Sequence, residues 1–172
     1  MNEESKLPRG LRNNNPLNIR RTGKDQWQGL RAIQQDAAFC QFESMAWGWR
    51  AAFYLLTRTY YHKYRLYTIR GIVSKWAPPQ DHNNTEAYIR NVCKWTGIGP
   101  DEPIGIPSQQ PARWMMLGVA MAIQENGLGK REQSEARISS AEREDGRPKV
   151  NGTDSLDYFA MLRGWELCRS EN

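Results

Sequence analysis

The stretch 114–123 contains no polar side chain, and it constrains the fold more than any other part of the chain. A helix that is apolar on all sides must be buried. The run is too short to span a bilayer, which needs about 20 apolar residues. The sequence therefore predicts a buried central helix over 108–125. Ser108 is its expected N-cap, Pro111 fits its first turn, and Gly127 ends it.

Glu125 is the only acidic residue of that predicted helix, and it lies at the C-terminal end. Partial burial raises the pKa of a carboxyl group, and the negative end of the helix dipole acts in the same direction. A glycosidase needs a carboxylic acid that stays protonated near neutral pH to protonate the leaving sugar oxygen. Glu125 is therefore a candidate general acid. The alternative is an ordinary polar residue that closes a core helix.

The other segments before this helix predict a mainly α protein with a small β component. Short strand-like pieces with turn-forming glycines predict a hairpin or three-stranded sheet over 17–42. Capping residues and apolar spacing predict three further helices, which begin at Ser44, Thr68 and Thr85. The expected fold is a small sheet packed on a helical bundle.

Composition divides the chain into three parts. Residues 1–8 form an expected flexible tail that lacks the apolar core of a signal peptide. Residues 9–127 form the main domain. Residues 128–172 combine a charged linker with a C-terminal amphipathic helix, which must pack on the domain or on a partner. Within them, a solvated helix is expected over 131–143, and Asp154 is the expected cap of the last helix.

The charge of the chain favours an anionic partner. The formal net charge is +5, and the chain contains seven Trp and seven Tyr. Nucleic acid, a membrane surface and cell-wall polymer all fit this charge, so it does not choose among them. The three cysteines are far apart and fit neither a disulfide framework nor metal-ligand spacing. Without a metal or nucleotide motif, no cofactor is expected, and no membrane-spanning segment is expected either.

Several separated motifs resemble a family of phage and prophage virion-associated proteins that are often labelled only as structural proteins. The resemblance covers about residues 9–127. The motifs are Arg9-Gly-x-Arg-Asn-Asn-Asn-Pro-x-Asn-Ile-Arg20, Trp27-x-Gly29, Asp36-x-x-Phe39-x-x-Phe42-x-Ser44, Gly48-x-Arg50-Ala51, Trp76-Ala-Pro78 and Asn84-Thr85-x-x-Tyr88-Ile89.

The same pattern is similar to a remote version of bacterial glucosaminidases and other lysozyme-like enzymes. In those enzymes an Asn-rich segment precedes a small sheet, and a later helix carries a Tyr. Residues 14–19 and Tyr88 match these two positions. The resemblance therefore implies a lysozyme-like fold and a role for Tyr88 in positioning substrate or stabilising an oxocarbenium-like transition state. The alternative for Tyr88 is a core ring with its hydroxyl at the surface.

One feature of the lysozyme-like pattern is displaced in this chain. In those enzymes the catalytic Glu ends a buried helix upstream of the Asn segment, where this chain has only Glu3 and Glu4. Residues 118–127 resemble that missing helix. The resemblance therefore implies a circular permutation in which the catalytic helix comes last. It predicts that Glu125 faces the loop 13–18 across a groove.

The resemblance also suggests partners for Glu125. Asp36 is the candidate second carboxylate, since it lies on the expected sheet; the alternative is a strand-end cap or a salt-bridge partner. Glu43 is a weaker choice. Trp27 and Trp76 are candidates for stacking on sugar rings, or they are simply packing residues. The remaining candidate substrate-binding residues are polar: Asn15, Asn18, Asn84 and Thr85.

These features predict an enzyme that cleaves peptidoglycan glycan strands, as a muramidase, lytic transglycosylase or glucosaminidase. It would reach the wall as a virion component or through a dedicated secretion machine. For the secreted form, an immunity protein is an expected partner. One alternative is a catalytically inactive lysozyme-like module that binds cell wall or builds a virion. Nucleic acid is not the expected partner, but a nucleic-acid binder is the second alternative, using arginines in and after the Asn-rich segment. Those arginines are Arg9, Arg12, Arg20, Arg21 and Arg31.

Overall fold

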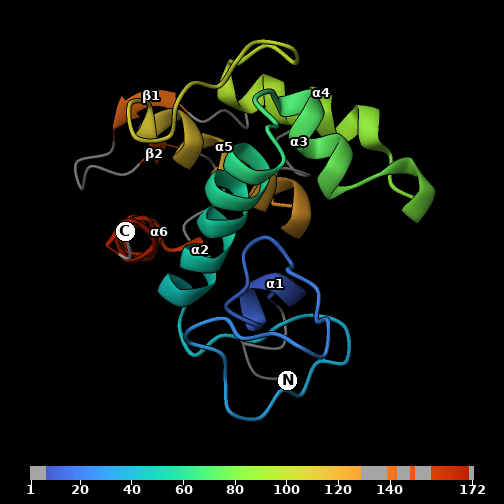
Figure 1. Ribbon diagram of the computed structural model, residues 1–172, viewed down its shortest axis with the longest axis vertical. Helices are drawn as coiled ribbons and strands as arrows, with labels where there is room; N and C mark the ends of the chain where they lie inside the picture. Colours follow the sequence, from blue (N-terminus) through green and yellow to red (C-terminus); the bar gives the residue numbers. More distant parts are fainter. Residues whose placement is uncertain (1–6, 129–138, 143–147, 150–155, 171–172) are drawn as a thin grey trace.

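The structure is a computed structural model that describes residues 7–128, 139–142, 148–149 and 156–170. The protein is mainly helical, as expected (Figure 1). Its elements are α1 (Arg9–Arg12), α2 (Met45–Tyr54), the π-helix η2 (Leu55–Lys63), α3 (Ile69–Trp76), the 3₁₀ turn η3 (Pro79–Asp81), α4 (Thr85–Thr96), α5 (Pro111–Asn126), β1 (Ser139–Glu142), β2 (Pro148–Lys149) and α6 (Tyr158–Arg169).

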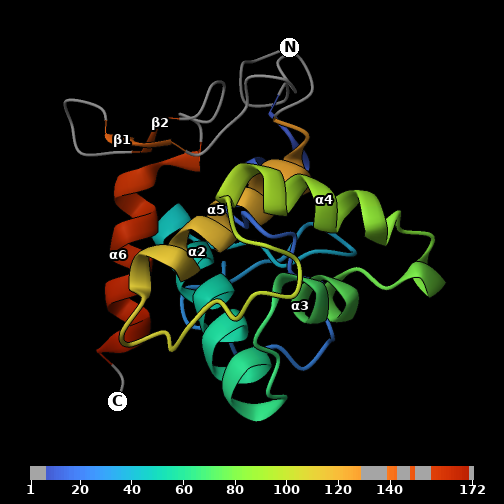
Figure 2. The same cartoon turned by 90° about the horizontal axis from the view of Figure 1, so that it is seen from above.

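Helix α5 lies at the centre of the bundle, where α1, α2, η2 and α4 pack against it (Figure 2). All its residues from Leu117 to Ile123 are buried, so the predicted burial is confirmed. The helix begins later than predicted, since Gln110 and not Ser108 is the N-cap residue. Gly127 ends the helix in the left-handed conformation, with a φ of 65°. This end places Glu125 in the last turn.

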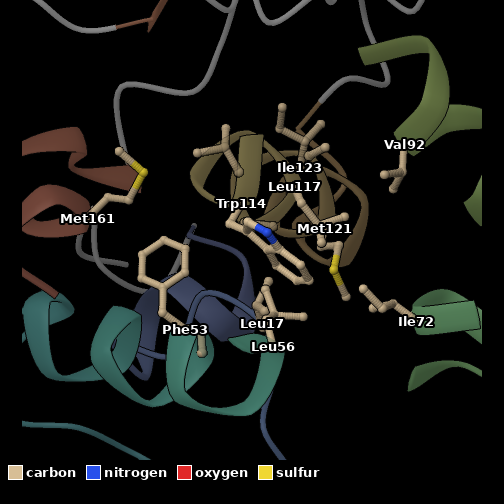
Figure 3. Close-up of a cluster of buried hydrophobic side chains, with 14 of the residues drawn as sticks. Leu17, Phe53, Leu56, Ile72, Val92, Trp114, Leu117, Met121, Ile123 and Met161 are labelled. Atoms are coloured by element: carbon tan, nitrogen blue, oxygen red, sulfur yellow. The ribbon is translucent and has the colours of Figure 1, made fainter. Parts of the chain in front are cut away.

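The core surrounds the indole ring of Trp114 (Figure 3). Phe53, Leu56 and Met121 are fully buried with it in the same cluster. The Trp114 indole N–H donates to the carbonyl of Gly105 at 2.9 Å, so this buried polar group is satisfied. The apolar run of the sequence thus forms the inside of the molecule.

The helix predicted from Ser44 to about residue 60 begins as expected but changes its hydrogen-bond pattern. The Ser44 hydroxyl accepts from the backbone N–H of Trp47 at 3.4 Å. The helix continues past Tyr54 as the π-helix η2, which ends at Lys63. π-helical turns are rare and often occur at functional sites. Here Tyr60 of η2 reaches the candidate active site described below.

The predicted sheet over 17–42 does not form. Two isolated antiparallel bridges occur instead, Arg20 with Phe39 and Leu30 with Phe42. Side-chain amides compete with a continuous ladder for the same backbone groups. For example, the backbone N–H of Gln41 donates to the Gln34 side chain at 2.8 Å. The segment is therefore a loop that is cross-linked by polar side chains.

Two other predicted helix starts are shifted. Asn84, not Thr85, caps α4, and its side-chain oxygen accepts from the N–H of Ala87 at 3.1 Å. Asp157 caps α6 by accepting from the N–H of Ala160 at 3.0 Å. The predicted cap Asp154 lies outside the described residues.

The C-terminal helix α6 packs along α2 (Figures 1 and 2). A Cβ atom at Gly164 would lie only 2.5 Å from the Cβ of Trp49 and 2.8 Å from the carbonyl oxygen of Ala46. The absence of a side chain at Gly164 therefore permits the close approach of the two helices. In the segment 131–143, where a helix was predicted, the described residues 139–142 form β1, which pairs antiparallel with β2. The rest of that segment lies outside the described residues.

Candidate active site

Glu125 faces the loop formed by residues 13–18, here called the Asn loop. The side-chain amide of Asn18 donates to Oε1 of Glu125 at 3.3 Å, and also to its backbone carbonyl at 3.3 Å. From the other side, the indole N–H of Trp76 donates to Oε2 at 3.4 Å. The structure thus brings together three residues that the sequence singled out, contributed by the Asn loop, α3 and α5.

The Asn loop is held in place by its own buried amides. The fully buried Asn15 donates to the carbonyls of Ile19 at 3.0 Å and Cys40 at 2.9 Å, and accepts from the N–H of Ile19 at 2.9 Å. Asn15, predicted as a substrate-binding residue, is therefore a buried cross-link in the structure and does not line the cleft described below. Asn18 adopts a φ of 53°, a left-handed conformation that Asn tolerates better than most residues.

Asn126 ties the end of α5 to the same loop. Its side-chain amide donates to the carbonyl of Pro16 at 2.9 Å and to that of Ala122 at 2.9 Å. The side-chain oxygens of Asn126 and Asn18 accept no hydrogen bond from the described residues. Both lie against Gly10, where an added Cβ would be 2.5 Å from the first oxygen and 2.7 Å from the second. Gly10 thus leaves the space that this arrangement needs.

Burial raises the pKa of Glu125 above its ordinary value of 4.5. Hydrogen bonds from Asn18 and Trp76 oppose this shift by stabilising the carboxylate, and so do the nearby Tyr88 hydroxyl and the charge of Arg20. The balance favours the protonated acid relative to an exposed Glu. The site therefore holds a carboxyl group that is accessible yet more readily protonated than usual.

Tyr88 lies beside this carboxyl group inside the protein. The residue is 5% exposed, and its buried hydroxyl has no hydrogen-bond partner among the described residues. Burial raises the pKa of Tyr88 well above 10, and the neighbouring Glu125 raises it further. The hydroxyl therefore stays neutral and is positioned to interact with the acid.

A cleft of about 380 Å³ opens in front of Glu125. Its lining combines aromatic and apolar side chains with charged and polar ones. The lining residues are Asn18, Ile19, Arg20, Thr22, Asp25, Trp27, Phe39, Leu55, Tyr60, Trp76, Ala77, Asp81, Asn83 and Glu125. Such a mixture suits a sugar, which presents both apolar ring faces and hydroxyl groups.

The aromatic residues of the cleft also pack on one another. Trp76 contacts Tyr60 edge to face at 5.9 Å between ring centroids, and Trp27 contacts Tyr54 in the same way at 5.7 Å. Trp27 and Trp76 are both half-buried and both line the cleft. Each ring is thus held by another aromatic ring while part of it remains accessible.

Asp36 does not belong to this cleft, so its prediction as the second carboxylate finds no geometric support. It forms a bidentate ion pair with Arg9, at 2.7 Å to Nε and 2.5 Å to a terminal nitrogen. It also accepts from Asn13 at 2.9 Å and from the backbone N–H groups of Ala38 at 2.9 Å and Phe39 at 3.0 Å. These donors hold the pKa of Asp36 well below its usual range. Asp36 is the salt-bridge partner that the alternative described.

We expect Asp36→Asn to reduce the free energy of unfolding by about 2 kcal/mol at neutral pH, because several donors lose a charged acceptor. The pKa of Asp36 is depressed in the folded state, so this stabilisation is present above pH 3.8 and is lost as the pH falls through the folded-state pKa. Urea unfolding at neutral and acidic pH measures both effects. The control Asp101→Asn removes an exposed ion pair with Arg70 and should cost less than about 0.5 kcal/mol. Equal losses for the two variants would contradict this account.

The other two predicted substrate-binding residues lie outside the cleft. Asn84 uses its side-chain oxygen to cap α4, and the buried Thr85 donates its hydroxyl to the carbonyl of Ala77 at 2.6 Å. Both line a separate, open hollow on the side of α3 and α4. The structure also places the weaker acid candidate Glu43 on the exposed surface and outside the cleft lining.

Sequence reasoning missed the cleft residues Asp25, Asp81 and Tyr60, and it considered Arg20 only as a contact for nucleic acid. Asp25 accepts from the N–H of Thr22 at 2.8 Å and from its hydroxyl at 3.0 Å. The turn-forming sequence Thr22-Gly-Lys-Asp25 was a signal for this arrangement. No local pattern could indicate that Asp81 and Tyr60 would face the same cavity.

The arginines near the Asn loop mostly serve the fold. Arg9 pairs with Asp36, Arg21 donates to the Asp36 carbonyl at 2.8 Å, and Arg31 donates to the carbonyls of Phe42 and Arg12 at 3.0 Å each. These contacts account for much of the basic cluster without a nucleic-acid partner. Within the described part of the chain, no group of three or more His, Cys, Asp or Glu residues is arranged to hold a metal ion. Of the helices described, none has the length and apolar character needed to cross a membrane.

Comparison with known proteins points to phages. No protein-family model matches the chain. The chain is 47% identical over 92 residues to Protein P5 of Pseudoalteromonas phage PM2. The aligned region covers 52% of this chain and 56% of Protein P5, so it spans little more than half of each. The chain is therefore similar to a phage protein over about half its length.

Proposed function

We propose that this protein cleaves the glycan strands of peptidoglycan, with Glu125 as the general acid. The observation that carries the proposal is the half-buried carboxyl group with a raised pKa at the wall of an aromatic-lined cleft. In the proposed step, Glu125 donates its proton to the glycosidic oxygen as the bond from that oxygen to the anomeric carbon breaks. Tyr88 and Asn18 orient the carboxyl group.

The position of Glu125 also supports a permuted lysozyme-like domain. In that proposal the buried helix is the last element of the domain, while the Asn loop is near its beginning. Glu125, at the end of that helix, must therefore contact a loop that lies at the opposite end of the domain sequence. The contact between Asn18 and Glu125 satisfies this requirement. We therefore propose that residues 9–127 form a lysozyme-like unit in which the small sheet is reduced to a cross-linked loop.

The second reacting group defines the reaction type. If a carboxylate activates water, Asp25 and Asp81 are the candidates, because both line the cleft with Glu125. If the substrate's own hydroxyl attacks, no second carboxylate is needed and an anhydro sugar results. The products therefore distinguish a hydrolase from a lytic transglycosylase.

Similarity to a phage protein favours a setting at the bacterial wall. A virion-borne enzyme would open the wall locally during genome delivery. The same chemistry would serve a secreted antibacterial factor, whose producer would need an immunity protein that blocks the cleft. The same similarity also favours a second candidate function, a lysozyme-like module without catalysis that binds wall polymer or builds the virion.

A turbidity assay on purified sacculi separates these functions. The proposal predicts that the wild-type protein clears sacculi at substoichiometric concentration. Binding to sacculi without clearing would instead identify the inactive module. A strong salt-dependent shift of DNA, with no binding to sacculi, would support a nucleic-acid binder.

We expect the rate of clearing to fall as the pH rises through the pKa of Glu125, because only the protonated acid donates a proton. The indole N–H of Trp76 lowers this pKa by stabilising the carboxylate. Trp76→Phe keeps an aromatic ring but removes the donor, so the alkaline limb of the pH–rate profile should move to higher pH. Profiles of both proteins on sacculi measure the shift. A limb that stays in place or moves to lower pH would contradict the assignment.

A further inference from the structure

A second hollow lies on the outer side of α3 and the start of α4. It has a volume of about 610 Å³, and six of its seven lining residues have polar side chains. Pro79 and His82 contribute from the η3 turn, and Ser74 contributes from the exposed surface of α3. The complete lining is Ser74, Pro79, His82, Asn83, Asn84, Thr85 and Glu86. The proposed cleavage step uses none of these side chains.

The second hollow meets the cleft at Asn83, which lines both. The side-chain amide of Asn83 donates to the carbonyl of Pro78 at 3.1 Å, which fixes the residue against the η3 turn. Asp81 of the same turn faces the cleft, while Pro79 lines the second hollow. The two depressions are therefore neighbours along one path across the end of α3.

The chemistry of the two depressions is complementary. The cleft offers an acid and aromatic faces, whereas the second hollow offers amide, hydroxyl and carboxylate groups. The oxygen of Asn84 is used by the helix cap, but its amide nitrogen takes no part in that cap. Such groups bind hydroxyl and N-acetyl substituents of a sugar that is not itself being cleaved.

We propose that the second hollow binds further sugars of the glycan strand whose scissile bond lies in the cleft at Glu125. This inference rests on the proposed function and specifies its substrate as a polymer, not a disaccharide. Binding energy from the remote sugars would hold the scissile bond in register with the acid. Asn84 and Thr85 line this extension, so they lie near the strand without touching the reacting bond.

Calorimetry with β-1,4-linked N-acetylglucosamine oligomers tests the proposal without requiring turnover. In the Glu125→Gln background, the hexamer should bind at least about tenfold more tightly than the trimer, as a few additional hydrogen bonds allow. Ser74→Trp should reduce this gain to about threefold or less while trimer binding stays unchanged, because an indole on the exposed surface of α3 fills the second hollow. Gln109→Trp, at an exposed position outside both depressions, is the matched control and should retain the full gain.

The possible results separate this inference from the proposed function. Equal affinities for trimer and hexamer, or a Ser74→Trp variant that binds like the control, would overturn the extended groove even if wild-type protein clears sacculi. Length-dependent binding with no clearing would support the groove and reject catalysis. An absence of binding by any oligomer, together with a failure to clear sacculi, would reject both.

Discussion

Replacing Glu125 with Gln is expected to lower the rate of sacculus clearing about 10³-fold, within the range that a general acid contributes. The substitution keeps the size and shape of the side chain and removes the proton that leaves with the glycosidic oxygen. Asn18 and Trp76 donate hydrogen bonds to the two different oxygens of the Glu125 carboxyl group. The amide of Gln retains one of these oxygens as an acceptor. The loss should therefore appear in kcat much more than in KM.

The stability of this variant provides the control. Burial raises the pKa of Glu125 in the folded state, so its favourable contribution is fully present below pH 4.5 and is lost as the pH rises through the folded-state pKa. An ionised, half-buried carboxylate is thus unfavourable near neutral pH. Glu125→Gln should consequently unfold at the same urea concentration as the wild type or at a higher one. An inactive variant that is clearly less stable would indicate a structural role instead.

Gly10→Ala is expected to have the second largest effect, because it displaces the Asn side chains that position Glu125. The new methyl group would meet the side-chain oxygens of Asn126 and Asn18 and, at 2.8 Å, the backbone carbonyl of Asn15. Neither side-chain amide can move away without losing hydrogen bonds, since Asn126 donates to Pro16 and Ala122, and Asn18 donates to Glu125. We expect a loss of about 2 kcal/mol in the free energy of unfolding.

The same variant should clear sacculi roughly tenfold to hundredfold more slowly, because a small displacement of a catalytic group is costly. Urea unfolding and the clearing assay, under conditions where the variant is folded, measure the two effects. Gly99→Ala is the matched control: an added Cβ there meets only the Glu102 side chain, at 3.5 Å or more, and the residue does not have a positive φ. If Gly10→Ala behaves like this control, the close packing described for the Asn loop is wrong.

The sequence predicted the central helix well because a long apolar run has few alternatives. Burial follows from the absence of polar side chains, and Gly127 marks the helix end by its backbone freedom. The position of Glu125 followed directly from these two features. Its place opposite the loop 13–18 was predicted from the resemblance, since no local pattern links residues so far apart in the chain; the direct contact with Asn18 was not predicted.

The failures have a common physical origin in side-chain hydrogen bonds. The side chains of Asn15, Gln34 and Gln41 take backbone groups that a sheet would use, so strand-like segments became a loop. Asp36 was expected to face the acid, yet the neighbouring Arg9 provides a stronger partner. Adjacent polar residues also exchanged roles at the start of α4, where Asn84 caps the helix and Thr85 is buried. Which neighbour takes which partner depends on tertiary contacts.

The cleft itself was beyond sequence reasoning. Its wall combines Arg20 and Asp25 from the loop, Tyr60 from a π-helix and Asp81 from a 3₁₀ turn. These residues share no spacing or motif, and Tyr60 lies in a π-helical segment that the sequence did not predict. Only the packing of these segments around the end of α5 brings them together.

Mass spectrometry of the glycan ends released from purified sacculi is the most direct test of the central claim, that Glu125 is an acid which breaks glycosidic bonds. Wild-type protein and Glu125→Gln should be compared at equal concentration. We predict new glycan ends with the wild type and almost none with the variant; reducing ends would indicate hydrolysis and anhydro ends a lytic transglycosylase. Equal release by both proteins, or no release by folded wild-type protein that binds sacculi, would contradict the claim.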